Sequence, residues 1–491
     1  MSHSELTKTA WIGLLRIVRR YYPALLALPL VLYLAIPTRN YYWDGIAFAN
    51  DIEKHAPGAV LVHPNHLVYA LWSGWLYGRI QELGFHTRSL FVMQVVNSIL
   101  AGLSVWLFYF CLRLRGIHMP VAVPVALAFG FTATWWRFAT DANAYVPSIF
   151  LLLTAYILLA SSKNDALAGF AHAGAIVFHQ LAIFSLPLAL VRLRGRPRGL
   201  AAYLACALLP VTAGYIAAYR AVSPQPTWPG LLAWVTYHSP DSEFSFRPLV
   251  NLALTIRGTF RLFFGGRISD FAGDRISWGV LFLAVLVSIA FLVHCWRVRG
   301  QGAALSSAPR HLFIWAGCYA LFLYFWMPQN TFYRLFYLPP LLIVFAFLLR
   351  SHAGAAWRFL PVLFLWNFAF VIYPQSRAEF NAPLHFALVQ RDKWPAGSPI
   401  VFYKFHPDLW TISYFNMQAA WISLERADTA ELDRHLAYAH SENKPLWLEA
   451  TAYELVAAVP AGRQWLAAHE RPGELLEFRD EKHHFQFRCF R

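Results

Sequence analysis

The segment YYWDGIAFANDIEKHAPGAVLVHPNHLVYA, residues 41–70, concentrates groups that could do acid–base chemistry. Its titratable side chains are Asp44, Asp51, Glu53, His55, His63 and His66. A carboxylate can take a proton from a hydroxyl as that hydroxyl attacks a carbon centre. An imidazole can contact a phosphate, and two imidazoles three residues apart can bind a metal ion. No specific third ligand accompanies His63 and His66, so neither a metal nor another cofactor is indicated.

Each of these residues also has a structural interpretation. Asp44 is a good helix N-cap residue, and an amphipathic stretch follows it. Pro64 and Asn65 are typical turn residues, so the turn alone could expose His63 and His66. A general base at Asp44 and a phosphate contact by the histidines are therefore hypotheses beside these alternatives.

Later candidates lie where apolar segments end. Asp141, in TATWWRFATDANAYVPSIF, could be a base, could cap the helix that begins near Asn143, or could pair with Arg137. His179 and Gln180 turn a short apolar hairpin, where a lone histidine is usually a buried, hydrogen-bonded residue.

Arg334, in MPQNTFYRLFYLPP, is either a snorkelling interfacial arginine or a clamp on a lipid phosphate. Taken singly, each candidate has an ordinary structural role. Asp44, His63, Asp141, His179 and Arg334 nevertheless all map to the same end of the apolar segments, and such convergence is typical of a site.

The elements that must position these residues are membrane spans. Of 491 residues, 58% are hydrophobic and 14% charged, with a mean hydropathy of +0.42, whereas soluble proteins carry about a quarter charged residues. The net charge of +15 does not indicate nucleic acid, because the basic residues stand in short clusters between apolar segments. The five cysteines include no CxxC pair, so neither a disulfide framework nor a cysteine metal site is predicted.

We expect about eleven spans, since a span needs roughly 20 apolar residues, fewer where neighbours cover its ends. The predicted spans are residues 21–37, 89–112, 119–136, 143–161, 165–180, 180–194, 199–219, 277–297, 311–327, 332–350 and 356–374. The first apolar run lacks a small-residue cleavage site, so we expect it to be retained.

The charges of alternate loops predict the orientation. One set of loops carries Arg113, Arg115, Lys163, Arg192, Arg194, Arg196, Arg198, Arg297, Arg299, Arg310, Arg350 and Arg358. The acids in these loops and the N-terminal tail are Glu5 and Asp165. Because basic loops stay in the cytoplasm, we expect a multi-pass protein of a bacterial inner (plasma) membrane, with a cytoplasmic N-terminus and the candidate residues outside.

The chain divides into a membrane domain and a soluble domain. We expect residues 1–374 to form the membrane domain, with long outer loops at 38–88 and 220–276. Residues 375–491 hold 15 of the 26 acids and alternate strand-like and helix-like pieces. They predict a small extracytoplasmic α/β domain, which makes the whole chain mainly α.

The order of these motifs resembles the GT-C superfamily of integral-membrane glycosyltransferases, nearest the protein O-mannosyltransferase-like group. YYWDGIAFAND is similar to the superfamily's first outer loop with its acid, and HPNHLVYALWSGWLYG to a His-Pro turn before an apolar helix. WWRFATDANAY, FHQLAIFSLP and FYRLFYLPPLL are similar to its later motifs, so the resemblance covers about residues 20–374. Related members often carry a second acid shortly after the first; here it would be Asp51 or Glu53.

The resemblance implies that a sugar moves from a polyprenyl-phosphate donor to an acceptor hydroxyl of a protein, glycan or lipid, with inversion. Asp44 would be the base, and Arg334, with His63 or His179, would stabilise the leaving phosphate. No nucleotide-binding motif is present. Two alternatives stay open. A transporter or flippase of lipid-linked glycans would commonly show internal repeats, and we find none convincing; a non-catalytic sugar-binding assembly subunit would tolerate loss of Asp44.

Overall fold

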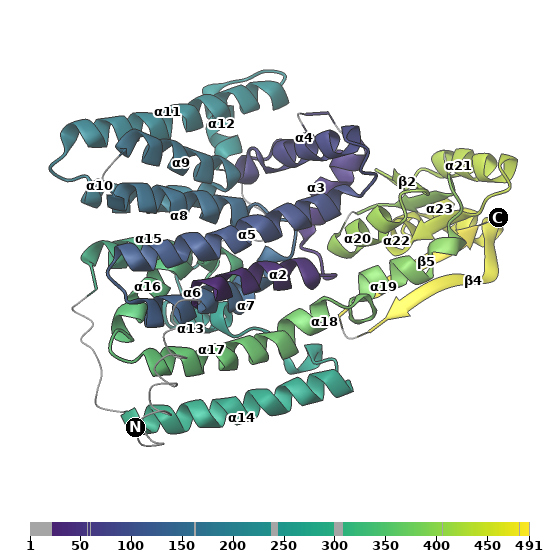
Figure 1. Cartoon of the computed structure of the whole chain (residues 1–491). Helices are drawn as coiled ribbons and strands as arrows, with labels where there is room; N and C mark the ends of the chain where they lie inside the picture. The colour runs from purple at the N-terminus through teal and green to yellow at the C-terminus, as the bar shows by residue number, and fades with distance from the viewer. Residues whose placement is uncertain are drawn as a thin grey trace, which may run out of the picture. The chain divides into compact units, whose positions relative to one another are not determined.

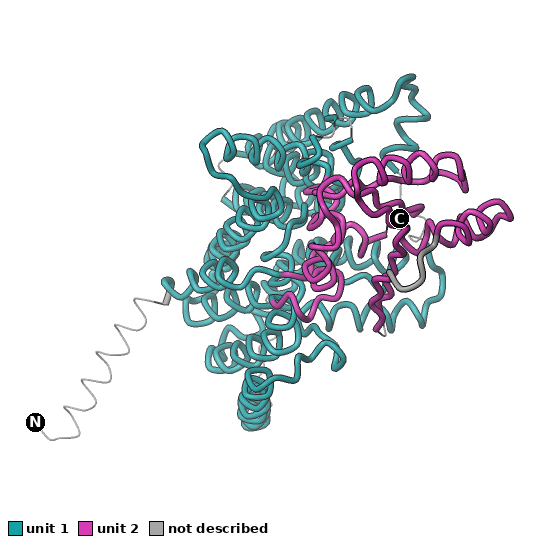
Figure 2. The backbone as a smooth tube through the Cα atoms, turned by 90° about the vertical axis from the view of Figure 1, so that its right-hand side faces the viewer, with its two compact units in different colours: residues 1–38, 51–376 teal, residues 39–50, 377–491 magenta. Residues whose placement is uncertain are grey.

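The computed structural model describes residues 22–490, apart from residues 56, 59, 162–163, 237–243, 299–307, 405 and 481. The chain forms two compact units, which Figure 2 colours separately. The helical unit comprises residues 1–38 and 51–376, and the C-terminal unit comprises residues 39–50 and 377–491. The helix α3 (Trp43–Glu53) therefore contains a division between the units, although its sequence reads as part of one outer loop.

Each apolar segment that was predicted to span the membrane contains helix in the described part of the chain. The helices are η1 (Tyr22–Ala27) with α2 (Leu28–Ala35), α5 (Ser89–Leu114), α6 (Met119–Phe131) with α7 (Ala133–Ala139), α8 (Tyr145–Ser161), α9 (Asp165–Phe178), η3 (Gln180–Ser185) with α10 (Leu186–Arg192), α11 (Pro197–Val222), α14 (Arg275–Val298), α15 (Arg310–Phe325), η6 (Phe332–Tyr337) with α16 (Leu338–Leu348), and α17 (Ala353–Asn367) with η7 (Phe368–Ile372) and α18 (Tyr373–Gln375).

Within the described residues, four helices are long and apolar enough to cross a membrane, or up to five if α6 and α7 form one span bent by 66°. The others are shorter apolar helices, such as α8 and α9. Because several of these helices are apolar all round, as α16 is, lipid and neighbouring helices are their natural surroundings. The chain is thus a multi-pass membrane protein, while the number of eleven crossings stays a prediction.

The helices of the helical unit run side by side (Figure 1). α9 packs between α8 and α11, α8 packs on α5, and α6 contacts both α5 and α17. α14 packs on α17 and exposes most of its apolar side chains, including Phe282, Ile289 and Leu292. A helix that is apolar and exposed in this way is suited to face lipid.

Shorter helices connect the long ones at the end where the candidate residues lie. They are η2 (Pro64–His66), α4 (Tyr69–Glu82), α12 (Trp228–Val235), α13 (Pro248–Phe263) and η4 (Ile268–Asp270). The two long loops at 38–88 and 220–276 thus contain the helices α4 and α13.

The C-terminal unit has a five-stranded sheet in the order β2-β1-β3-β5-β4. The strands are β1 (Pro399–Phe402), β2 (Ala420–Ser423), β3 (Leu446–Glu449), β4 (Glu470–Arg479) and β5 (His484–Phe490). β1 pairs in parallel with β2 and β3, and β5 pairs antiparallel with β3 and β4. The strands β4 and β5 form a terminal hairpin, with Phe478 opposite Phe485.

Helices cover this sheet. Successive strand residues point to opposite faces, so a strand that is apolar throughout needs cover on both faces. Ile400 and Phe402 belong to one apolar cluster and Val401 to another, so both faces of β1 are buried. The helices are η8 (Ala378–Phe380), α19 (Ala382–Val389), η9 (Arg391–Lys393), α20 (Pro407–Phe415), α21 (Thr429–Ser441), α22 (Ala450–Ala457) and α23 (Pro460–His469). The α/β class predicted for this region is confirmed.

Candidate functional site

Three of the predicted histidines meet in the helical unit. The ring centroids of His66 and His179 are 4.7 Å apart, and those of His63 and His66 are 5.9 Å apart. The Tyr145 ring lies 4.5 Å from His179 and 6.1 Å from His66. Backbone contact between the two histidine segments, and a 2.7 Å hydrogen bond from the Tyr215 hydroxyl to the Pro64 carbonyl, hold the turn in place.

Local backbone bonds fix the protonation of two of these rings. His63 Nδ1 accepts a hydrogen bond from the Asn65 N–H at 3.2 Å, and His179 Nδ1 accepts one from the Leu181 N–H at 3.2 Å. Each histidine thereby caps a 3₁₀ helix, η2 or η3. A ring nitrogen that accepts carries no proton, so each imidazole is neutral and presents Nε2–H as a donor. Both rings are therefore suited to donate to an anion rather than to act as bases.

His179 has a donor to spare. It is buried, and its Nε2 has no hydrogen-bond partner among the described residues. A buried donor without an acceptor is costly, roughly 1–3 kcal/mol. An acceptor atom of a ligand would remove that cost.

A tight loop places Asp141 beside this cluster. Asp141 is 1% exposed, and its Oδ1 accepts from the Ala142 N–H at 2.8 Å. Asn143, rather than Asp141, caps α8, because its Oδ1 accepts from Tyr145 N at 3.1 Å and Val146 N at 3.2 Å. The capping interpretation of Asp141 is therefore wrong. The Asn97 amide fixes the loop by donating to the carbonyls of Asp141 at 2.8 Å and Asn143 at 2.9 Å.

Tyr69 joins the loop to the histidine segment. It is fully buried, and the negative charge of Asp141 acts on it. We call the set His63, His66, Tyr69, Asp141, Tyr145 and His179 the histidine–aspartate site. It combines neutral donors, phenols and a buried carboxylate at one end of an apolar bundle.

Arg334 is a second buried group with a hydrogen-bond donor that is not used within the described residues. It is 0% exposed, so the interpretation as a snorkelling arginine is wrong. Nη1 donates to the Tyr337 hydroxyl at 2.6 Å and Nη2 to the Pro328 carbonyl at 2.5 Å, while Nε has no acceptor among the described residues. A buried cation without a counter-ion is strongly unfavourable, so this guanidinium is suited to an anionic ligand.

Gly258 on α13 provides the space for that guanidinium. A Cβ at this position would stand 2.4 Å from Arg334 Nε and 3.0 Å from its Cζ. The neighbouring Thr259 hydroxyl lies 2.9 Å from the Tyr337 hydroxyl, which extends the network. We call Arg334, Tyr337, Pro328, Gly258 and Thr259 the arginine site.

The two sites share the helix η6. Tyr333 and Phe336, three residues apart, pack on the His179 ring at centroid distances of 5.9 and 5.1 Å. Arg334 and Tyr337, also three apart, face α13 instead. Because a 3₁₀ helix has three residues per turn, one short helix presents one pair to each site.

The remaining predicted residues take other places. Asp44 lies in the first turn of α3, within residues 39–50 of the C-terminal unit, where stacking of Tyr41 on Phe415 at 5.6 Å helps to hold the segment. Its role as a base stays a prediction. Asp51 belongs to the helical unit, and burial raises its pKa, opposed by the charge of Lys54.

Glu53 has partners at the start of α5. Its carboxylate accepts from Arg88 Nε at 2.6 Å, from Ser89 N at 2.7 Å and from Ser89 Oγ at 2.9 Å. Gln180 donates to the Val235 carbonyl at 2.8 Å, at the end of α12. Arg137 lies half-buried in the last turn of α7. Among the described residues, no group of three or more His, Cys, Asp or Glu is placed to hold a metal ion.

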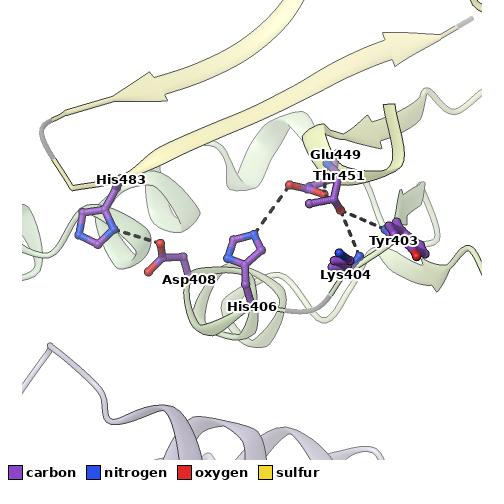
Figure 3. Close-up of polar contacts among 7 residues, drawn as sticks. All are labelled: Tyr403, Lys404, His406, Asp408, Glu449, Thr451 and His483. Atoms are coloured by element: carbon purple, nitrogen blue, oxygen red, sulfur yellow. Dashed lines mark hydrogen bonds and ion pairs between the residues drawn. The ribbon is translucent and has the colours of Figure 1, made fainter. Parts of the chain in front are cut away.

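The C-terminal unit has its own polar cluster, where β1 and β3 end (Figure 3). Glu449 accepts hydrogen bonds from the N–H, at 2.8 Å, and the hydroxyl of Thr451, and so caps α22. The Thr451 hydroxyl in turn accepts from the N–H groups of Tyr403 at 3.1 Å and Lys404 at 3.2 Å. His406 Nε2 lies 3.8 Å from Glu449. These contacts fasten two loops together, which is a structural role.

Sequence reasoning did not identify Tyr69, Tyr145, Asn97, Gly258 or Tyr337. Tyrosines are frequent in this chain, so neither their type nor their spacing distinguishes them. Asn97 did carry a signal, because an amide inside the apolar segment 89–112 is unusual and commonly functional or structural.

Comparison with known proteins gives likenesses of structure alone. No protein-family model and no curated protein matches the chain. Among solved structures, the chain is similar to ArnT from Cupriavidus metallidurans in the apo state, with 13% identity, 98% of each chain covered and a TM-score of 0.48. The same protein bound to undecaprenyl phosphate gives 12% identity, 98% of each chain and 0.48. The Archaeoglobus fulgidus oligosaccharyltransferase, in a complex with Zn and sulfate, gives 11% identity, 94% of this chain, 72% of that chain and 0.38.

Proposed function

We propose that this protein is a membrane glycosyltransferase of the GT-C type that moves a sugar from a polyprenyl-phosphate donor to an acceptor hydroxyl. The observation that carries the proposal is Arg334, a fully buried cation whose Nε–H has no acceptor among the described residues. Its surroundings are apolar helices, so the matching anion is one that enters with a lipid tail. A phosphate suits the planar guanidinium fork.

The reaction forms one bond and breaks one. The acceptor oxygen attacks the anomeric carbon while the bond from that carbon to the phosphate oxygen breaks, and its electron pair stays on the phosphate. The configuration at the anomeric carbon is thereby inverted. Arg334 and the Nε2–H donors of His63 or His179 would stabilise the charge that grows on the leaving phosphate.

The acceptor proton needs a carboxylate. Asp44 is our first choice, on the position of its loop and the resemblance of YYWDGIAFAND to the superfamily's acid-bearing loop. Asp141 is the second, because it is buried and its charge acts on Tyr69 in the histidine–aspartate site. Asp51, whose pKa is raised by burial, is a further choice within the same segment as Asp44.

The setting follows from the charges of the loops. We place the protein in a bacterial inner membrane, with the N-terminus in the cytoplasm and both candidate sites at the outer surface, and residues 375–491 outside the cytoplasm. A donor anchored in the membrane needs no soluble nucleotide sugar. The acceptor would be a protein, glycan or lipid, and the sugar a hexose, as in the protein O-mannosyltransferase-like group.

The arginine site provides the test. In the purified full chain, Arg334→Ala should weaken binding of a polyprenyl-phosphate sugar at least tenfold, and Arg334→Lys should restore part of it, because lysine keeps the charge but lacks the fork. Gly258→Ala should also weaken binding, since its Cβ would displace the guanidinium.

The controls are matched to each change. Arg267→Ala removes an exposed arginine from the same unit, and Gly317→Ala adds a methyl group on α15 where nothing lies within 4 Å. Both should bind donor like the wild type. Wild-type donor affinity in Arg334→Ala and Gly258→Ala would remove the assignment.

A further inference from the structure

Two arginines gather at the end of the helical unit away from the histidine–aspartate site. Arg115 follows the last turn of α5, and Arg192 ends α10. Tyr156 of α8 and His311, in the first turn of α15, lie with them. α5 and α8 start beside the histidine–aspartate site and run away from it, so these four residues lie near the opposite membrane surface.

Close contacts connect the four side chains. Arg115 Nε donates to the Tyr156 hydroxyl at 2.7 Å, and the guanidinium carbon lies 5.0 Å from the centre of the Tyr156 ring. The Tyr156 hydroxyl lies 3.4 Å from His311 Nε2, and Arg192 Nη2 donates to the Leu159 carbonyl at 3.2 Å. The charge of Arg115 acts on Arg192, and the charges of both act on His311. The two cations are thus held near each other.

Their charge is not balanced within the described part of the chain. Arg115 Nη2 and Arg192 Nε are buried donors without a hydrogen-bond partner, and neither arginine forms an ion pair among the described residues. Asp165, the described acid in these loops, already pairs with Arg196 at 3.2 Å. Like charges held together in partly buried positions repel each other, so the arrangement favours an anion from outside the chain.

An ordinary topological role does not account for this arrangement. Arginines that only fix orientation can stay in solvent, as Arg194 does in the neighbouring loop and Arg198 in the first turn of α11. Arg115 and Arg192 are instead half-buried and fastened to Tyr156 and to the Leu159 carbonyl. Both residues keep part of their surface exposed, so they lie at the boundary of the bundle rather than inside it.

We infer that Arg115 and Arg192, with Tyr156 and His311, form a phosphate-binding site filled by the headgroup of an anionic membrane lipid. Two guanidinium groups match the several acceptor oxygens of a phosphate. The apolar helices α5, α8, α10 and α15, at whose ends the site lies, suit a phosphate that carries acyl chains. The site is separate from the proposed catalytic residues and holds whether or not transfer is the protein's function.

The test uses the full chain in phosphatidylcholine nanodiscs. Phosphatidylglycerol is titrated in, and its binding is followed by native mass spectrometry and by the thermal midpoint of unfolding. The wild type should bind it saturably. The double variant Arg115→Gln, Arg192→Gln should bind at least tenfold more weakly, whereas the control Arg194→Gln, Arg198→Gln, with the same loss of charge on the same face, should bind like the wild type.

Inorganic phosphate is the second probe. We expect it not to displace phosphatidylglycerol at millimolar concentration. Tight binding of inorganic phosphate without any preference for the lipid would overturn the headgroup assignment. Two results would overturn the site itself. One is the absence of saturable phosphatidylglycerol binding to the wild type, which does not depend on whether the double variant folds. The other is a loss of affinity in the control variant as large as the loss in the double variant.

Discussion

At the scale of single residues, the proposed transfer depends on which side chains donate hydrogen bonds and which can accept a proton. His63 and His179 use Nδ1 to cap short helices, so their remaining nitrogens donate. Neither is available as a base in that state. For the proposed transfer we therefore assign the acceptor proton to a carboxylate, and Asp44 and Asp141 are the two candidates.

Replacement of Asp44 by asparagine tests it as the base. Asp44 lies inside the first turn of α3, which begins at Trp43, so it is not the N-cap of that helix. Asparagine keeps the size of the side chain but does not take up the proton. If Asp44 is the base, transfer by Asp44→Asn should fall by roughly 10²-fold or more, with unchanged thermal unfolding and donor binding. The measurement is the rate of sugar transfer, with the thermal midpoint recorded in parallel.

Asp141→Asn is the comparison variant. Near wild-type transfer in Asp44→Asn together with a large loss in Asp141→Asn would move the role of base to Asp141. Full activity in both variants would leave Asp51 to be tested and would count against either assignment.

The site could be predicted from the sequence only in part. Arg334 and Asp141 are unusual in an apolar context, so their residue type identified them. The helix η6 presents one side to His179 and, with Arg334, the other side to α13. This depends on its three residues per turn, and the local sequence does not show that the segment is a 3₁₀ helix. The capping of η2 and η3 by His63 and His179 also requires the backbone.

At the scale of elements, the helices were predictable because long apolar runs leave few choices. β2 was missed since its four residues, AWIS, are half-buried or exposed and show no strong pattern. The bend between α6 and α7, where Thr132 is extended, was also not predicted.

The terminal hairpin β4–β5 provides a prediction of pH dependence. His483, just before β5, lies 3.0 Å from Asp408 of α20, and this hydrogen bond to the carboxylate raises the pKa of the histidine. A raised pKa in the folded state means that the stabilisation is complete below the unfolded value of about 6.5 and is lost as pH rises through the folded pKa. The pair should contribute about 1 kcal/mol or less.

Hydrogen exchange in the full chain can measure this effect. After correction for intrinsic rates, amides at the start of β5 should lose several-fold protection between about pH 6 and pH 8, and Asp408→Asn should abolish most of that change. Glu477→Gln, which breaks the more exposed pair with His484 on the same hairpin, is the control and should leave it intact. A pH-independent wild type would contradict the assignment.

At the scale of the whole molecule, the segment 39–50 shows the limit of reading the chain in order. Its sequence assigns it to the first outer loop, but it belongs to the C-terminal unit. Its partner there, Phe415, is far away in the sequence and gives no local signal.

Topology is the prediction at this scale. From the basic loops we predict that the C-terminal unit lies outside the cytoplasm. A reporter that is active only in the cytoplasm, fused after Arg491, should therefore be silent, and the same reporter in the loop at residues 195–196 should be active. Activity of the C-terminal fusion would reverse the orientation and remove the outer-site proposal.

The central claim is that the arginine site binds the phosphate of a lipid-linked sugar. The most direct measurement is a cryo-EM map of the full chain in nanodiscs with a polyprenyl-phosphate sugar bound. We predict phosphate density within hydrogen-bonding distance of the Arg334 guanidinium, with the sugar directed to the histidine–aspartate site and the polyprenyl chain between helices. Donor density with its phosphate elsewhere, and Arg334 still bonded only to Tyr337 and Pro328, would contradict the account.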